Sequence, residues 1–437
     1  MIEILRAAIF HTPGNPFSEP TALVALADGG LAIDAGRVAL CGDYSSVRAA
    51  YPLAAVRDLR GDNDGDGGCI LPGFIDTHTH YPQIRILGGL GYSLLDWLAE
   101  RTLPEEARLA DTAYAQTVAH EFVGALAAHG TTTALVFASH FAAATAALFE
   151  AAETKGLRVF SGLVMADRML RPELHRTPDA AYRDSKGLIA RFHGNARLGY
   201  AVIPRFALSA SEAMLEMCGS LLRETDGLRF TTHINENRQE ISEVARLFPW
   251  ADDYLAVYEK FNLIGPKSVL AHNVHAMESV LKRLAGRQAS VAHCPCSNAA
   301  LGSGVFPLQR HLRSGVRFAL GTDVGGGTGF GMMKESLQAC LQQRVAPDPM
   351  ILTPAQMLFL ATRAGAEALG IGDETGDFAT GKAADFVYLK APRESVLSVA
   401  LRHSEAPEQM LAALFTMAGA ESIREVRVAG DLVFNDN

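Results

Sequence analysis

The sequence predicts an α/β fold, a (β/α)8 barrel of the TIM type with a small β-sandwich domain formed by the N- and C-terminal segments. Two observations support this prediction. Between residues 69 and 375, short apolar runs alternate with longer Ala- and Leu-rich stretches of helical spacing, as in parallel strands joined by helices. Residues 1–68 and 376–437 instead contain short strand-like pieces separated by turns. We therefore expect a barrel domain (69–375) and a terminal domain (1–68 plus 376–437).

Eight apolar runs supply the strands that a closed barrel requires. They cover residues 70–77, 132–137, 158–164, 198–203, 229–232, 268–271, 289–292 and 316–320. The segments between them, such as 111–129 and 211–223, repeat apolar residues at helical intervals and are expected to form the outer helices.

Composition excludes several classes of protein. The chain has 437 residues, of which 49% are hydrophobic, so it can bury a large core without disulfide bonds. Its net charge of -9 argues against binding to nucleic acid. No apolar run approaches the roughly 20 residues that cross a membrane, and the N-terminus lacks the pattern of a signal peptide. We expect a cytoplasmic enzyme with six free cysteines, acting on neither nucleic acid nor membranes.

An acidic loop, GDNDGDGG at residues 61–68, matches the first half of a calcium-binding loop. A calcium loop needs a glutamate at its twelfth position, where this chain has Gly73, and Pro72 opposes the helix that should follow. We therefore interpret the segment as a solvated turn.

Histidines and one aspartate follow five of the predicted strands. They are His78 and His80 after the first strand, His233 after the fifth, His272 after the sixth, His293 after the seventh and Asp323 after the eighth. The carboxyl ends of barrel strands meet at one rim, where active sites form. Imidazoles with a carboxylate suit zinc or another transition metal such as iron, which would activate a bound water. His293, in AHCPCSN, either supports this site or packs in the core.

Two neighbouring patterns add nothing to this chemistry. Cys294 and Cys296 supply only two thiols with no second pair, so we regard them as structural. The glycine-rich GTDVGGGTGFG lacks the Lys-Ser/Thr of a phosphate loop, and its glycines are expected to let the backbone pass close to a ligand.

Three further side chains are candidates for substrate chemistry at the same rim. Glu236, three residues after His233, can carry a proton to a leaving group. Arg205, in VIPRFALS, offers only hydrogen-bond donors and suits a carbonyl or carboxylate, whereas Gln83 can donate and accept. Together they would read the edge of a planar, amide-containing ring.

Two aromatic residues could sandwich such a ring. They are Phe206, beside Arg205, and Trp97, for which a role in the core is nearly as plausible.

Several motifs together resemble the metal-dependent amidohydrolase superfamily. They are GFIDTHTHYPQ, THINENRQE, VLAHN, AHCPCSN and GTDVGGG. Within that superfamily, LLDWLAERTLPEEAR and IPRFALS resemble the guanine deaminases, and the resemblance covers nearly the whole chain. It implies a barrel with a small β-sandwich, one zinc ion per subunit, a small-molecule purine substrate and a homodimer.

The resemblance also implies roles for individual residues. The implied zinc ligands are His78, His80, His233 and Asp323. The implied catalytic residues are Glu236, which would protonate N3 of guanine, Asp323, which would take the proton of the attacking water, and His272, which would bond that water. The residues expected to line the substrate are Gln83, Arg205, Phe206, His233, Glu236 and Trp97. The reaction implied is hydrolysis of guanine to xanthine and ammonia.

Two alternatives stay open at this point. A deaminase of the same superfamily could act on 8-oxoguanine, a pterin, a triazine or a nucleoside. Arg205 and Gln83 favour guanine, because an arginine donor is mismatched to the amino group of adenine. A barrel retained only as a scaffold would be expected to have lost metal ligands, whereas this chain keeps them all. A second metal bridged by a carboxylated lysine is not expected, because Lys155 and Lys186 do not follow strands.

Overall fold

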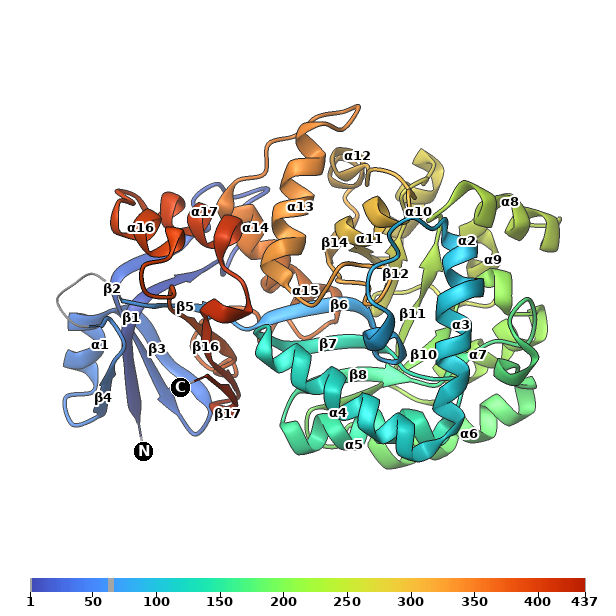
Figure 1. The fold of residues 1–437 in the computed structure, drawn as a ribbon, viewed down its shortest axis with the longest axis horizontal. Coiled ribbons are helices and arrows are strands. Elements are labelled where there is room, and N and C mark those ends of the chain that lie inside the picture. The colour runs from blue at the N-terminus through green and yellow to red at the C-terminus, as the bar shows by residue number, and fades with distance from the viewer. Residues whose placement is uncertain (1, 62–66, 437) are drawn as a thin grey trace.

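The structure, a computed structural model, describes residues 2–61 and 67–436 and contains the predicted barrel. Its strands are β6 (Phe74–His80), β7 (Thr131–Phe137), β8 (Arg158–Gly162), β10 (Leu198–Pro204), β11 (Arg229–Ile234), β12 (Ser268–His272), β13 (Ser290–His293) and β14 (Arg317–Leu320), with the short β9 (Val164–Met165) beside β10. They pair in parallel in the order β6-β7-β8-β10-β11-β12-β13-β14 (Figure 1). The α/β barrel expected from the sequence is therefore confirmed.

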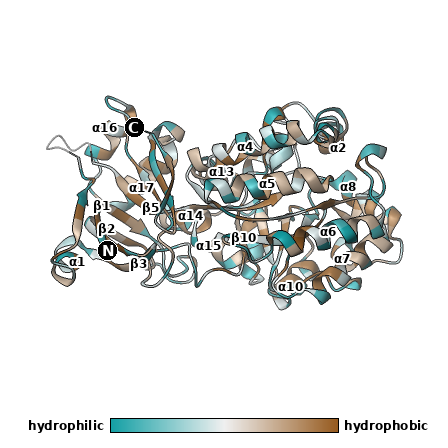
Figure 2. Ribbon diagram, turned by 90° about the horizontal axis from the view of Figure 1, so that it is seen from below, coloured by the Kyte–Doolittle hydropathy of each residue, from teal (hydrophilic) through white to brown (hydrophobic). Residues whose placement is uncertain are grey.

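Helices surround this sheet on its outer side (Figure 1). In chain order they are α2 (Leu94–Trp97), α3 (Leu103–Ala107), α4 (Thr112–Ala128), α5 (Ala142–Lys155), α6 (Pro178–Phe192), α7 (Glu212–Glu224), α8 (Arg238–Leu247), α9 (Tyr254–Lys260), α10 (Glu278–Gly286), α11 (Pro295–Ala300), α12 (Leu308–Arg313), α13 (Met332–Arg344), α14 (Pro354–Ala361) and α15 (Arg363–Ala368). These helices mix hydrophilic and hydrophobic residues (Figure 2). That composition suits elements with one face on the sheet and the other in water.

A second sheet combines both ends of the chain, as the sequence predicts. Its strands are β1 (Glu3–His11), β2 (Val24–Asp34), β3 (Arg37–Asp43), β4 (Ala55–Asp58), β5 (Cys69–Pro72), β15 (Phe386–Leu389), β16 (Ile423–Val428) and β17 (Asp431–Asn435). The order is β17-β16-β15-β5-β1-β2-β3, with β4 beside β1. Three helices belong to the same terminal segments, α1 (Tyr44–Ala50), α16 (Val396–Arg402) and α17 (Pro407–Met417).

The prediction of one barrel strand over residues 70–77 is wrong. Its first half, β5, pairs with β1 and β15 in the terminal sheet, and the barrel strand β6 begins only at Phe74. Gly73 lies between the two strands, where a Cβ atom would come within 2.2 Å of the Thr132 side chain. The chain thus passes from one sheet to the other at a residue that must be glycine.

The first and last barrel strands are joined at the carboxyl end by a short network. Thr322 donates from its backbone N–H and its hydroxyl to the two carboxylate oxygens of Asp76, at 3.1 and 2.5 Å. The backbone N–H of Asp323 donates to the carbonyl of His78 at 2.8 Å. This closure places the residues that follow β14 directly against the last residues of β6.

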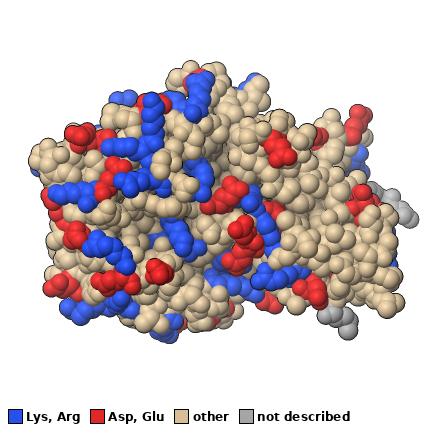
Figure 3. Space-filling view, turned by 180° about the vertical axis from the view of Figure 1, so that it is seen from behind, with Lys and Arg blue, Asp and Glu red and all other residues tan. Residues whose placement is uncertain are grey.

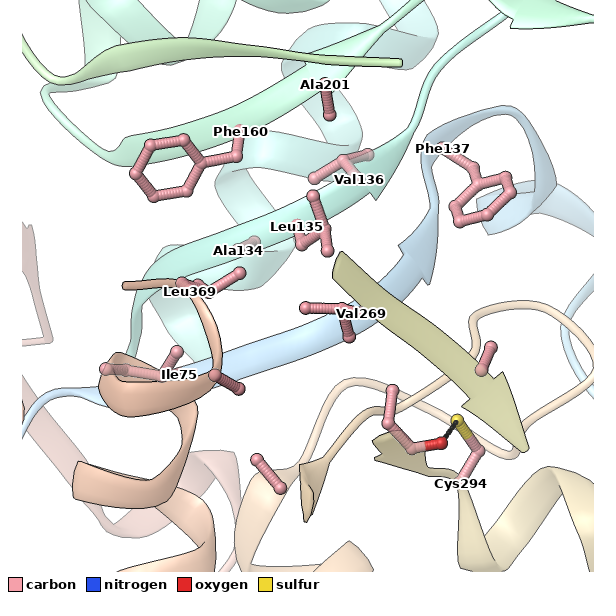
Figure 4. Close-up of a cluster of buried hydrophobic side chains, with 14 of the residues drawn as sticks. Ile75, Ala134, Leu135, Val136, Phe137, Phe160, Ala201, Val269, Cys294 and Leu369 are labelled. Carbon is pink, nitrogen blue, oxygen red and sulfur yellow. Dashed lines mark hydrogen bonds between the residues drawn. The ribbon is translucent and has the colours of Figure 1, made fainter. Parts of the chain in front are cut away.

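The barrel interior is packed with apolar side chains from neighbouring strands. Figure 4 shows Leu135 of β7 and Val269 of β12 inside the barrel, Phe137 at the end of β7, and Ile75 of β6 against the α15 segment. Such a filled interior is a core rather than a channel.

Three expectations about the whole chain can be compared with the structure. The six cysteines are free thiols, and no helix within residues 2–61 and 67–436 is long and apolar enough to cross a membrane. The face drawn in Figure 3 intersperses basic and acidic side chains and carries no continuous basic surface. Residues 62–66 of the acidic loop lie outside the described residues, so its interpretation as a solvated turn stays a prediction.

Candidate metal centre and substrate pocket

The histidines and the aspartate predicted to bind a metal meet at the carboxyl end of the barrel. The Nε2 atoms of His78 and His80 lie 3.2 Å apart, and each lies 3.2 Å from Oδ1 of Asp323. The His233 ring lies 4.7 Å from the His78 ring and 5.3 Å from the His80 ring, centroid to centroid. Ligand atoms of His78, His233, His272 and Asp323 all lie within 4.8 Å of one another. The structure thus brings together all the residues implied as ligands, with His272 beside them.

These side chains fit a transition metal in chemistry and spacing. Imidazole nitrogens with lone pairs repel one another at 3.2 Å unless a cation or a proton lies between them. Tetrahedral zinc ligands, each about 2.0–2.1 Å from the ion, stand about 3.3 Å from one another. Burial lowers the pKa of His78 to about 3 and also lowers those of His80 and His233, which keeps the imidazoles neutral as metal binding requires.

Asp323 supplies the negative charge of the cluster. Burial opposes its ionisation, but hydrogen bonding with His78 and His80 outweighs burial and holds the Asp323 pKa well below its usual range. Ser297 donates to the other carboxylate oxygen, Oδ2, at 2.6 Å. The backbone of Asp323 has a left-handed φ of 48°, a strained conformation that is often found at functional sites.

Hydrogen bonds donated by Nδ1–H fix the orientation of two of the imidazoles. His233 Nδ1–H donates to the carbonyl of Arg205 at 2.7 Å, because a carbonyl can only accept. His272 Nδ1–H donates to Oδ1 of Asn298 at 2.9 Å. Both bonds leave the Nε2 atom facing the cluster, the arrangement that orients histidine ligands in metal sites.

Packing holds three of the rings from a further side. The ring centroid of Phe137 lies 4.8 Å from that of His78, 4.6 Å from that of His80 and 4.8 Å from that of His233. Phe137 is fully buried. It therefore restricts the positions of three of the four implied ligands at once.

Glu236 lies beside the cluster and is able to hold a proton there. Its Oε2 lies 3.5 Å from His272 Nε2, and Ser303 donates its hydroxyl to Oε1 at 3.1 Å. Burial raises the pKa of Glu236 to about 7, although the nearby His272 acts in the opposite direction. A carboxyl group with such a pKa can give or take a proton at neutral pH.

One pocket opens on this cluster and contains every residue predicted to line the substrate. Its lining consists of His80, Gln83, Leu94, Trp97, Leu98, Arg205, Phe206, His233, Glu236, Leu301, Asp323 and Gly326. Trp97 also packs with Ile86, Leu94 and Leu301 in a small apolar cluster, as expected for a residue of the core. Its contact with a substrate ring stays a prediction. The pocket combines a cluster that could hold a metal ion, a carboxyl group that can hold a proton and hydrogen-bond donors, a set of groups that suits hydrolysis of an amino-substituted heterocycle.

Several site residues escaped the sequence analysis. Glu106 binds both Arg205 and Gln83, Asn298 orients His272, and Phe137 packs on the ligands. Glu106 lies in the motif LLDWLAERTLPEEAR and Asn298 in AHCPCSN. The presence of these two residues in motifs that carry the family resemblance was the only sequence feature that could have pointed to them. His293 is not part of the cluster: its ring stacks on Phe306, with centroids 4.3 Å apart.

Comparison with known proteins gives concordant matches over the whole chain. The model of the amidohydrolase family matches residues 69–433. The chain is 55% identical to a probable guanine deaminase of Deinococcus radiodurans over 99% of both chains, and 37% identical to the guanine deaminase of Escherichia coli over 98% of this chain and 96% of that one. The solved structure of the E. coli guanine deaminase superposes with a TM-score of 0.93 at 35% identity, covering 100% of both chains.

Proposed function

Because the chain belongs to the amidohydrolase family, we propose that it catalyses the hydrolytic deamination of guanine to xanthine and ammonia. The observation that carries this proposal is the pocket in which Arg205, Gln83 and Glu236 face the histidine–aspartate cluster. Guanine offers the matching groups on one flat ring: a keto oxygen, a protonatable N3 and an amino group on C2. The names of the relatives agree with this substrate.

The cluster is proposed to hold one zinc ion per subunit. The ligands would be His78, His80, His233 and Asp323, with His272 beside the ion. A zinc ion in such a site activates water as a nucleophile at neutral pH. The neutral imidazoles and the ionised Asp323 support this assignment.

Three residues are proposed to bind the base. Arg205 would donate to the keto oxygen and Gln83 would bond the same edge of the ring, because both side chains line the pocket. Phe206, 3% exposed and also in the lining, would pack on the face of the base. This placement directs the C2 amino group toward Glu236 and the cluster.

Proton transfer is proposed to use the two buried carboxyl groups. Glu236 would deliver its proton to N3, so that the ring can accept the attacking oxygen at C2. Asp323 would take the proton of the attacking water, and His272 would bond that water through the Nε2 that faces the cluster. Return of a proton to the amino group then lets ammonia leave as the C–N bond breaks, which gives xanthine.

The test of the proposal is a comparison of substrates on the purified, zinc-loaded protein. Guanine, adenine, guanosine, 8-oxoguanine, a pterin and a triazine are each supplied, and ammonia release is measured together with the purine product. We expect rapid conversion of guanine to xanthine. Turnover of another compound with none of guanine would refute the proposed substrate. We also propose a homodimer in the cytoplasm, which gel filtration with light scattering and cell fractionation test.

A further inference from the structure

The amide of Gln83 is fixed from both sides. Its Oε1 accepts a hydrogen bond from the backbone N–H of Gly325 at 3.1 Å, and its Nε2 donates to Oε1 of Glu106 at 2.9 Å. A backbone N–H can only donate and a carboxylate can only accept. Turning the amide over would therefore place a donor against a donor and an acceptor against an acceptor, which defines a single orientation for Gln83.

Glu106 binds Arg205 with the same carboxylate group. Nη1 of Arg205 donates to Oε1 and Oε2 of Glu106, at 2.7 Å each. Glu106 and Arg205 are each 3% exposed, and His140 Nε2 lies 3.3 Å from Glu106 Oε2. Burial opposes ionisation of Glu106, but the positive charge of Arg205 and the contact with His140 outweigh it and hold the Glu106 pKa well below its usual range. The carboxylate is therefore an acceptor only.

The shared oxygen has a consequence for the pocket. Gln83 Nε2 and Arg205 Nη1 both donate to Oε1 of Glu106, so these two nitrogens lie next to each other. Gln83 keeps one further N–H, and no group among the described residues accepts from Nε or Nη2 of Arg205. Both side chains line the pocket. The spare polar groups of this pair are therefore mainly donors, which match a ring edge that carries hydrogen-bond acceptors.

We propose that Glu106 is a positioning residue that determines which purines this site accepts. By holding Gln83 and Arg205 with N–H groups available to the pocket, it favours a base with a keto oxygen over a base with an amino group at that position. Glu106 itself is not required to touch the substrate. The inference rests on the proposed deamination of guanine and adds to it the residue that sets the discrimination.

Replacing Glu106 by glutamine should relax that discrimination. A glutamine at this position has one acceptor oxygen and one NH2 group in place of two acceptor oxygens. It therefore cannot accept all three hydrogen bonds that Glu106 accepts from Gln83 and Arg205. The Gln83 amide then loses one of the two hydrogen bonds that fix it. Turning its oxygen toward the pocket, where it can accept from an amino group on the base, costs only the remaining bond from Gly325.

The experiment compares two substrates that differ at the discriminated position and at the adjacent N1, which carries a hydrogen in guanine but not in 2,6-diaminopurine. Guanine and 2,6-diaminopurine share the C2 amino group, but diaminopurine carries an amino group where guanine has its keto oxygen. The zinc-loaded full chain and its variants are assayed for ammonia release, and kcat/KM is measured for both bases. Sites that pair with a polar group can reject a mismatched analogue by up to about 10⁴- to 10⁵-fold. We expect the guanine preference of E106Q to fall by about 10-fold or more, the effect of one exchanged hydrogen bond.

The matched control is E105Q, the same substitution at the neighbouring residue. Glu105 is also buried, but it pairs with Arg108 at 3.0 Å and with Tyr114, away from the pocket residues. We expect E105Q to keep the wild-type preference. A purely structural role for Glu106 would reduce kcat/KM for both bases by the same factor and leave their ratio unchanged.

Two further variants keep the inference falsifiable if E106Q fails to fold. E106D retains the carboxylate and should restore the preference, whereas Gln83→Leu removes the amide without unpairing Arg205 and should weaken it. Suppose that the protein converts guanine and that E106Q or Gln83→Leu keeps the wild-type ratio of kcat/KM for the two bases. This result overturns the role of Glu106 but leaves the proposed function in place. If the zinc-loaded wild type does not convert guanine, the proposed function itself fails and the inference fails with it.

Discussion

Removing the aromatic ring of Phe137 should lower the zinc affinity of the protein. Removing an equally buried ring far from the metal centre should lower only the stability of the fold. The ring is fully buried at the end of β7, and its centroid lies within 4.8 Å of those of His78, His80 and His233. A Phe137→Ala substitution leaves a cavity beside all three imidazoles. They would then be free to leave the positions in which their nitrogens converge.

The size of the effect follows from two separate contributions. Truncation of a buried phenylalanine costs about 3–5 kcal/mol of folding free energy. Domains are usually stable by about 5–15 kcal/mol, so the variant is expected to remain folded under native conditions. Removing groups that orient metal ligands typically lowers metal affinity by about 10- to 100-fold, and we expect a loss in this range.

The assay measures zinc affinity by competition with a chromophoric chelator and stability by urea denaturation. Phe149→Ala is the matched control, because Phe149 is equally buried but stacks on Phe192, with centroids 4.8 Å apart, between the outer helices α5 and α6. We expect similar losses of stability in both variants and weaker zinc binding only in Phe137→Ala. Wild-type zinc affinity in Phe137→Ala, or an equal loss in Phe149→Ala, would refute the reasoning.

Two further predictions concern the chemistry. Glu236→Gln removes the proposed proton carrier, so kcat for guanine should fall by about 10²- to 10⁴-fold while zinc content and the unfolding midpoint stay unchanged; steady-state kinetics with near-normal turnover would contradict its role. Arg205→Lys should raise KM for guanine by about 10-fold or more, because an ammonium cannot reproduce the guanidinium fork that binds Glu106 and the base. An unchanged KM would exclude Arg205 from substrate binding.

The barrel could be predicted from the sequence because its strands are buried on both faces. Parallel strands such as β7 and β10 form short apolar runs between amphipathic helices, a pattern that is visible without any tertiary contact. The error at residues 70–77 arose from the same property. Both β5 and β6 are fully buried, and no local pattern tells which sheet an apolar strand joins when its partner β15 lies some three hundred residues away.

The candidate site divides in a similar way. His78, His233 and His272 lie in the last residues of their strands and Asp323 follows β14. Barrel geometry brings such strand ends together whatever the details of packing. Glu106 lies on the short helix α3, and its contacts with Arg205 and Gln83 depend on how that segment folds over the rim.

The spacing of residues in the sequence also could not predict the contacts of Asn298, on α11, or of Phe137, which resembles any other apolar residue of a strand.

The division of the chain into domains at residues 68 and 375 stays a prediction.

The most direct test of the account is whether guanine hydrolysis requires metal in the histidine–aspartate cluster. The purified protein is stripped with a chelator, and zinc is then added back in steps while ammonia release from guanine and bound zinc are measured together. We predict that activity disappears on stripping and returns in proportion to bound zinc, reaching its maximum at one ion per chain. Full turnover of guanine by the stripped protein, or a fully zinc-loaded protein that releases no ammonia from guanine, would contradict the account.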